Sequence, residues 1–173
     1  MIIGHGDVAS ALVDLPAGRH GRKGWTYFAA GVSNSGETRE SEYKREADLL
    51  MKQEKSRHIV YFSSLCIFYS DTRYARHKKH MEELIKKNFK HYTIIRMGNI
   101  TWGKNPHTLI NHFKNLIKKQ QKIEIWDTHR YLINKEEFSH WINLIPEWNC
   151  EMNIPGVRLT IDKIVKQIKS GRL

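Results

Sequence analysis

A tyrosine, a lysine and two serines have the types and spacing needed for acid–base chemistry on a hydroxyl or carbonyl group. Tyr74 and Lys78 lie four residues apart in a segment with helical periodicity, so their side chains share one face of the helix. A nearby ammonium stabilises tyrosinate and lowers the pKa of the phenol from its usual value of about 10. Such a phenol can exchange a proton with a substrate near neutral pH. Ser63 and Ser64 end the preceding predicted strand, where a hydroxyl can hold the same substrate oxygen.

A glycine-rich turn near the N-terminus fits a diphosphate. Gly4, Gly6 and Ala9 form a Gly-x-Gly-x-x-Ala pattern where a short predicted strand turns into a helix. Glycines in such a turn let a pyrophosphate approach the backbone, and the start of the helix supplies N–H donors. The pattern alone is weak, and its position after a strand strengthens it.

The region after this turn departs from the usual dinucleotide-binding pattern. An acidic residue about 20 residues beyond the turn commonly binds the adenosine ribose. Here the region is basic and contains Arg19, Arg22 and Lys23. Two interpretations stay open: these side chains hold the ribose phosphate of NADP, or they form a solvated loop.

Predicted strands and helices alternate along the chain, which favours a parallel α/β sheet with helices on both faces. Apolar runs predict strands over residues 1–3, 25–30, 58–62, 92–97, 123–126 and 131–133. Helical periodicity predicts helices over residues 9–15, 41–55, 72–88, 107–120, 136–145 and 162–170.

Together these motifs resemble the short-chain dehydrogenase/reductase superfamily, specifically its extended branch of NAD-dependent nucleotide-sugar epimerases and dehydratases. The resemblance covers nearly the whole chain, with one internal gap. Further segments that are similar to family motifs are residues 29–31, 58–68, 96–103, 130–137 and 153–156. The resemblance implies a Rossmann-like fold with a shortened second strand–helix unit. It also implies a single compact domain over residues 1–173, of which about 104–173 carry a reduced substrate lobe.

The resemblance further implies an NAD(P)-dependent oxidoreductase or epimerase that acts on a nucleotide-sugar. Tyr74 would be the general acid/base, Lys78 would tune it and hold the nicotinamide ribose, and Ser64 would orient the reacting oxygen. Arg130 would contact the substrate diphosphate. The cofactor, NAD or NADP, would be bound by Gly4, Gly6, Asp7, Val8, Ala9, Ala29, Ala30, Gly31, Ser63, Tyr74, Lys78, Met97 and Asn99.

Leu65 and Cys66 stand where the 4,6-dehydratases of the family carry an acidic pair, which disfavours a dehydratase. Residues 64–68 are instead similar to an element of GDP-L-fucose synthase, whose cysteine acts in epimerisation together with a histidine. Cys66 and His107 could therefore deprotonate and reprotonate a sugar carbon. The alternative is that Cys66 is a core residue.

Composition excludes several classes of protein. The 173 residues are 40% hydrophobic, which is enough for a packed core and excludes intrinsic disorder. No apolar run is long enough for a transmembrane helix, and no signal-peptide pattern is present. Two cysteines make no disulfide framework, so we expect a cytoplasmic protein without a membrane partner. His77 and His80 lie on one helix face without a third ligand, so we expect no metal site.

The formal net charge of +11 raises the question of nucleic-acid binding. The basic residues are spread over several predicted helices without a recognised nucleic-acid motif. We therefore favour a solvated basic surface over a nucleic-acid interface. Two further alternatives stay open: a non-catalytic dinucleotide-binding or sensor module, and a homodimer that completes the site.

Overall fold

A parallel sheet forms the centre of the molecule. The computed structural model describes residues 1–15, 22–125 and 128–173. Within these residues, the strands of the main sheet lie in the order β1-β2-β3-β4-β7 and run parallel to one another. They are β1 (Ile2–Ile3), β2 (Trp25–Phe28), β3 (His58–Ser64), β4 (Tyr92–Met97) and β7 (Cys150–Ile154). The inner strands β2, β3 and β4 are buried along almost their whole length, as expected for apolar strands that are covered on both faces.

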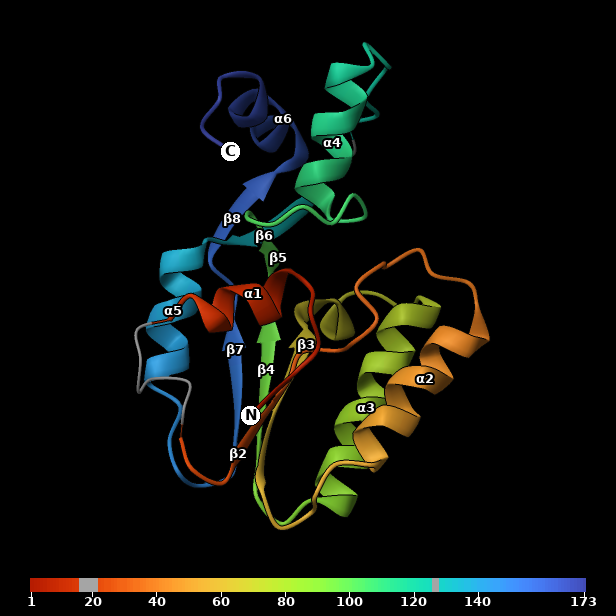
Figure 1. The fold of residues 1–173 in the computed structure, drawn as a ribbon. Coiled ribbons are helices and arrows are strands. Elements are labelled where there is room, and N and C mark those ends of the chain that lie inside the picture. The colour runs from red at the N-terminus through yellow and green to blue at the C-terminus, as the bar shows by residue number, and fades with distance from the viewer. Residues whose placement is uncertain (16–21, 126–127) are drawn as a thin grey trace.

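Helices cover both faces of this sheet (Figure 1). On one face, α2 (Glu40–Met51) and α3 (Arg73–Asn88) enclose a core that includes Leu50 of α2 and Met81 of α3. On the other face lie α1 (Asp7–Val13) and α5 (Lys135–Asn143), whose buried residues include Leu12 and Phe138. The predicted α/β fold with helices on both faces is confirmed.

The main sheet ends at β1. In a dinucleotide-binding sheet of order 3-2-1-4-5-6, strand 1 lies in the centre, with strands 2 and 3 beside it. Here β1 pairs with β2, and within the described residues no strand pairs with its outer edge. Only residues 14–24 separate α1 from β2. The shortened second strand–helix unit is therefore confirmed.

A smaller sheet of order β5-β6-β8 lies beyond the carboxyl ends of the main sheet (Figure 1). Its strands are β5 (Asn99–Ile100), β6 (His129–Ile133) and β8 (Val157–Thr160), and β8 runs antiparallel to β6. Two helices, α4 (Leu109–Lys118) and α6 (Ile161–Lys169), share a separate core with this sheet. Residues 104–173 contain α4, β6, β8 and α6 of this lobe but not β5, while α5 and β7 within the same range pack with the main sheet.

The observed helix starts all lie within two residues of the predicted ones, and polar side chains cap four of the six helices. Thr72, Thr108, Asn134 and Thr160 each accept a hydrogen bond from the N–H three residues later. The strand predicted over 123–126 is not formed at residues 123–125, and residue 126 lies outside the described part of the chain. The antiparallel β8 and the short β5 and β7 are differences from the sequence prediction.

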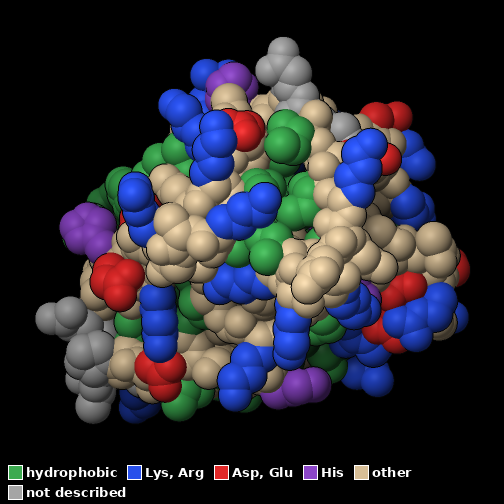
Figure 2. All heavy atoms as spheres, turned by 90° about the horizontal axis from the view of Figure 1, so that it is seen from above, with side chains coloured by type: hydrophobic (Ala, Val, Ile, Leu, Met, Phe, Trp, Pro, Cys, Tyr) green, Lys and Arg blue, Asp and Glu red, His purple; other side chains and the backbone are tan. Residues whose placement is uncertain are grey.

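On the face that Figure 2 shows, the charged side chains are dispersed. Figure 2 shows Lys and Arg scattered over the upper face, with Asp and Glu among them and apolar side chains in the centre. Across the part of the chain that the structure describes, no helix combines the length and apolar character needed to span a membrane.

Candidate functional site

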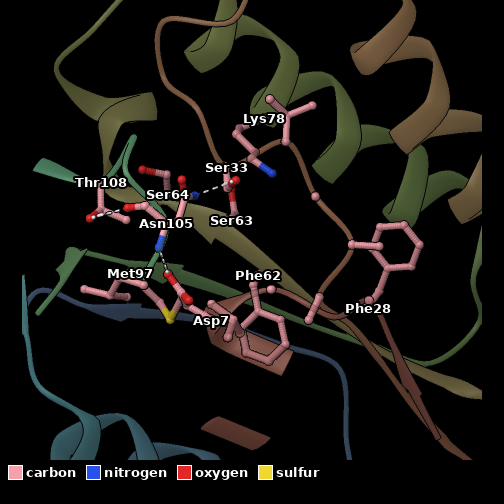
Figure 3. Close-up of a pocket in the computed structure, with 18 of the residues that line it drawn as sticks. Asp7, Phe28, Ser33, Phe62, Ser63, Ser64, Lys78, Met97, Asn105 and Thr108 are labelled. Carbon is pink, nitrogen blue, oxygen red and sulfur yellow. Dashed lines mark hydrogen bonds between the residues drawn. The ribbon is translucent and has the colours of Figure 1, made fainter. Parts of the chain in front are cut away.

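A cavity of about 670 Å³ opens at the carboxyl ends of β1, β2, β3 and β4. This edge of a parallel α/β sheet is where ligands bind. Most of the residues that the sequence assigned to cofactor and chemistry lie around it (Figure 3). They are Gly4, Gly6, Asp7, Val8, Ala29, Ala30, Gly31, Ser63, Ser64, Tyr74, Lys78, Met97 and Asn99. Ala9 is buried within α1 and is not among the lining residues.

The two glycines of the turn have different physical reasons to be glycine. Gly4 has φ +117°, and a Cβ there would lie 2.5 Å from the carbonyl oxygen of Ala29. Gly4 is therefore required by the close packing of the turn on the end of β2. Gly6 has ordinary backbone angles, and a Cβ there would meet nothing within 4 Å. Since Gly6 lines the cavity, its missing side chain leaves that space open to a ligand.

Asp7, predicted to bind cofactor, holds a loop across the mouth of the cavity. Its carboxylate accepts hydrogen bonds from the backbone N–H groups of Lys104 at 3.0 Å and Asn105 at 3.1 Å. The side chain of Asn105 donates to Ser33 Oγ at 2.9 Å (Figure 3). The loop is thereby tied both to the start of α1 and to the segment that follows β2.

Lys78 is held by a buried cluster that the sequence analysis missed. Its Nζ lies 3.0 Å from Glu46 Oε1 and 3.0 Å from Tyr61 Oη. Glu46, on α2, also accepts hydrogen bonds from Tyr61 Oη, Val32 N and His77 Nε2. Burial opposes ionisation of Glu46, but the Lys78 charge and these hydrogen bonds outweigh burial and hold its pKa well below 4.5. The carboxylate is therefore ionised and balances the charge of Lys78.

The glycine at the end of β2 makes room for this ion pair. A Cβ at Gly31 would lie 2.7 Å from Lys78 Nζ and 3.0 Å from Glu46 Oε1. The sequence does indicate that Glu46 is buried, because Glu46 lies on the same face of α2 as the apolar residues Tyr43 and Leu50.

Tyr74 and Lys78 share one side of α3, and Lys78 Nζ lies 5.6 Å from the centroid of the Tyr74 ring. Burial raises the pKa of Tyr74 well above 10, and the Cys66 and Glu46 groups raise it further. The predicted lowering of this pKa is not found, because burial of the phenol is the largest effect on it. The phenol is therefore protonated at neutral pH. Ser64 Oγ accepts a hydrogen bond from Cys66 N at 3.3 Å.

A second buried carboxylate fixes the end of β3. Ser63 Oγ donates to Glu82 Oε1 at 2.6 Å, and Arg96 Nε donates to the same oxygen at 3.0 Å. Arg96 also pairs with Glu151 of β7. Ser63 is thus anchored from α3 and β4, while the neighbouring Ser64 hydroxyl remains at the cavity.

Three further candidate residues lie away from the main cavity. Cys66 is half-buried, and burial raises the pKa of its thiol. His107 lines an adjoining cavity of about 420 Å³ together with Arg39 and Arg45, and Arg45 also lines the main cavity. The guanidinium of Arg130 donates to Thr128 Oγ1 and to the carbonyl oxygen of His129. The structure does not bring these three side chains together.

Of the basic residues considered for NADP, the two that the structure describes, Arg22 and Lys23, do not line the cavity. Arg22 lies at the amino end of β2, where its Nη1 donates to the carbonyl oxygen of Ile145 at 2.7 Å and its guanidinium stacks over Trp25. Lys23 follows at the same end, and Arg19 lies outside the described residues. Arg22 therefore has a structural partner instead of a ribose phosphate. In the described ranges, no group of three or more His, Cys, Asp or Glu side chains could hold a metal ion.

Solved structures share this arrangement of strands and helices. WbmG of Bordetella bronchiseptica, determined in complex with NAD, matches 86% of this chain and 56% of its own, at 14% identity and a TM-score of 0.62. UDP-glucose 4-epimerase of Thermotoga maritima, determined with UDP-glucose, matches 84% of this chain and 60% of its own, at 16% identity and a TM-score of 0.67. This chain has the fold of these proteins. The fold-level resemblance is thus confirmed.

A third structure with this fold is dTDP-4-dehydrorhamnose reductase of Bacillus anthracis, determined in complex with NADP. It matches 86% of this chain and 62% of its own, at 15% identity and a TM-score of 0.59. The present chain therefore spans between 56% and 62% of the length of these three proteins. No protein-family model and no curated protein sequence matches the chain.

Proposed function

We propose that the chain is an NAD(P)-dependent oxidoreductase or epimerase that acts on a nucleotide-activated sugar. The observation that carries the proposal is that Gly6, Ser64, Tyr74 and Lys78 line one cavity at the carboxyl edge of the sheet. Proteins of the same fold have been determined with NAD, NADP and UDP-glucose, which supports this class of ligand.

The residues of the cavity fit a nicotinamide cofactor. Ala29, Ala30 and Gly31 are small and leave the end of β2 open to the cavity. An ammonium group has three N–H donors, and Glu46 and Tyr61 accept two of those of Lys78. We assign the third to a ribose hydroxyl of the cofactor.

Bound nicotinamide supplies the donor or acceptor of a hydride. In the reducing direction, Tyr74 Oη donates its proton to the carbonyl oxygen of the sugar, and Ser64 Oγ holds the same oxygen. The raised pKa of Tyr74 keeps the phenol protonated without ligand, so it carries the proton for this step but is a weaker acid than a free tyrosine. Cys66 and His107 have no part in the proposed reaction, since they do not meet at the cavity.

Turnover of nucleotide-sugars tests this proposal. Keto and hydroxy forms of UDP-, GDP- and dTDP-sugars are incubated with NADH or NAD and with NADPH or NADP, and cofactor absorbance is followed together with sugar epimer composition. Tyr74→Phe is expected to lower kcat by about 10²–10⁴-fold without changing the Kd of the cofactor. The matched control is Tyr69→Phe at an exposed position, with unchanged kcat. Equal turnover by wild type and Tyr74→Phe contradicts the proposal.

A second candidate function is a dinucleotide-binding or sensor module without turnover. The edge position of β1 in the described part of the main sheet favours it. The two functions differ in one result: a module binds the cofactor, but no nucleotide-sugar is converted and Tyr74→Phe has no effect.

A further inference from the structure

The main sheet contains one mononucleotide-binding half where a dinucleotide fold has two. A dinucleotide fold joins two such halves across strand 1, with the cofactor spanning the crevice where the strand order reverses. In this chain β1 is the edge strand, and β2, β3, β4 and β7 all lie on one side of it. The described residues place no strand on the other side.

The cavity follows the same asymmetry. Its walls come from the turn between β1 and α1, from the segments that follow β2, β3 and β4, and from α2 and α3, with Arg45 of α2 as a basic group at the cavity. It therefore extends from Gly6 towards Ser64, Lys78 and Asn99, all on the inner side of β1. Ser64 and Lys78 are the residues that we assign to the reacting oxygen and to a ribose hydroxyl of the cofactor.

The basic group considered for a second phosphate is directed elsewhere. The guanidinium of Arg22 is bound to the carbonyl oxygen of Ile145 and stacked 4.5 Å above Trp25. Trp25 is the first residue of β2, whereas Phe28, its last residue, lines the cavity. The length of β2 thus separates Arg22 from the ligand.

We propose that the site recognises a nicotinamide mononucleotide unit and does not bind the adenosine part of a dinucleotide. The inference rests on the proposed function and adds the part of the cofactor that is recognised. The adenosine of NAD would extend past the outer edge of β1, where the described residues place no strand to hold it. Since unbound groups add no affinity, NADH, NADPH and the reduced mononucleotide should bind almost equally.

The test is a calorimetric titration of the full chain with reduced nicotinamide mononucleotide, NADH and NADPH. AMP and 2′,5′-ADP serve as probes of the adenosine half, and AMP matches the reduced mononucleotide in phosphate charge. The expected Kd values of the three nicotinamide ligands agree within about threefold, and AMP binds at least about tenfold more weakly. Gly6→Val, whose side chain would enter the open space, is expected to abolish binding of all three. Ser10→Val, at an exposed position of α1, is the control and should bind like wild type.

The outcomes separate this inference from the proposed function. The inference is wrong if NADH binds about tenfold or more tightly than the reduced mononucleotide. It is also wrong if 2′,5′-ADP competes with NADH as effectively as the reduced mononucleotide does. In both cases the proposed function is unaffected. If Gly6→Val binds all ligands unchanged, the ligand lies elsewhere and the inference is overturned. If wild type binds no nicotinamide ligand, the proposed function fails, and the inference fails with it.

Discussion

Lys78 and Glu46 form an ion pair inside the protein. Lys78 Nζ lies 3.0 Å from Glu46 Oε1, and the two side chains are 3% and 0% exposed. The lysine assigned to the cofactor is therefore held by a carboxylate from α2, so that two helices and the end of β2 fix its position.

Replacing Glu46 by Gln removes the negative charge and leaves the ammonium of Lys78 buried without its counter-charge. We expect the free energy of unfolding to fall by about 3–5 kcal/mol, as for other buried pairs that lose one partner. Urea unfolding followed by circular dichroism measures it. Asp48→Asn, on an exposed position of the same helix, is the control and should change the value by less than about 0.5 kcal/mol. A similar small change in both variants would mean that the pair does not stabilise the fold.

His58 makes the stability depend on pH. It is buried, its ring stacks on Trp25, and its Nε2 lies 2.8 Å from Thr93 Oγ1. Burial first, and then the charges of His91 and Arg22, lower its pKa from 6.5 to about 4. Between pH 6.5 and pH 4, His58 binds a proton in the unfolded chain but not in the folded chain. The free energy of unfolding therefore falls as the pH drops below 6.5.

We expect a loss of about 1–2 kcal/mol from His58 between pH 7 and pH 5. Urea unfolding at the two pH values should show a smaller difference in His58→Gln than in wild type. His91→Gln, at an exposed position, should retain most of the difference. An NMR titration that finds an ordinary pKa for His58 would contradict this account.

The two glycines of the turn should respond differently to the same substitution. Gly4→Ala forces a side chain into left-handed backbone and against Ala29, so we expect a loss of at least about 1–3 kcal/mol of stability. Gly6→Ala should leave the thermal midpoint nearly unchanged, because its Cβ points into open space. Differential scanning fluorimetry compares the two. Equal destabilisation would show that Gly6 is also required by the fold.

Asp7 should determine how firmly the loop over the cavity is held. Asp7→Ala removes two hydrogen bonds to the backbone of Lys104 and Asn105, each worth about 1 kcal/mol. Hydrogen exchange of these two amides is expected to accelerate by about tenfold or more. Asp14→Ala, whose carboxylate pairs with Lys135 near the surface, is the control and should leave the loop amides unchanged.

The parts of the fold that the sequence predicted well are those with strong local patterns. The strand at Tyr92–Met97 has the predicted bounds, and α3 begins one residue later than predicted because Thr72 is its cap. The strand β7 was missed because Glu151 and Asn153 interrupt its apolar pattern. An edge strand accommodates them, and Glu151 pairs with Arg96.

The candidate site was predictable in its main residues, because motifs after consecutive parallel strands converge at one edge of a sheet. The role of Glu46 was not predictable, because its partner Lys78 lies 32 residues away and only the packing of α2 on α3 brings the two side chains together. The raised pKa of Tyr74 was not predictable from its spacing to Lys78, because burial of the phenol is its main cause. The position of the Arg22 side chain was not predictable either, because the carbonyl oxygen that it binds belongs to Ile145, 123 residues away in the sequence.

The central claim is that the cavity beside Gly6 and Lys78 binds a nicotinamide cofactor. Calorimetric titration of NADH into wild type and Gly6→Val, both shown to be folded, tests it most directly. We expect a Kd of about 1–100 μM for wild type, a range typical of substrate-sized ligands, and no measurable heat for Gly6→Val. Absence of NADH binding by folded wild type, or equal binding by both proteins, would contradict the claim.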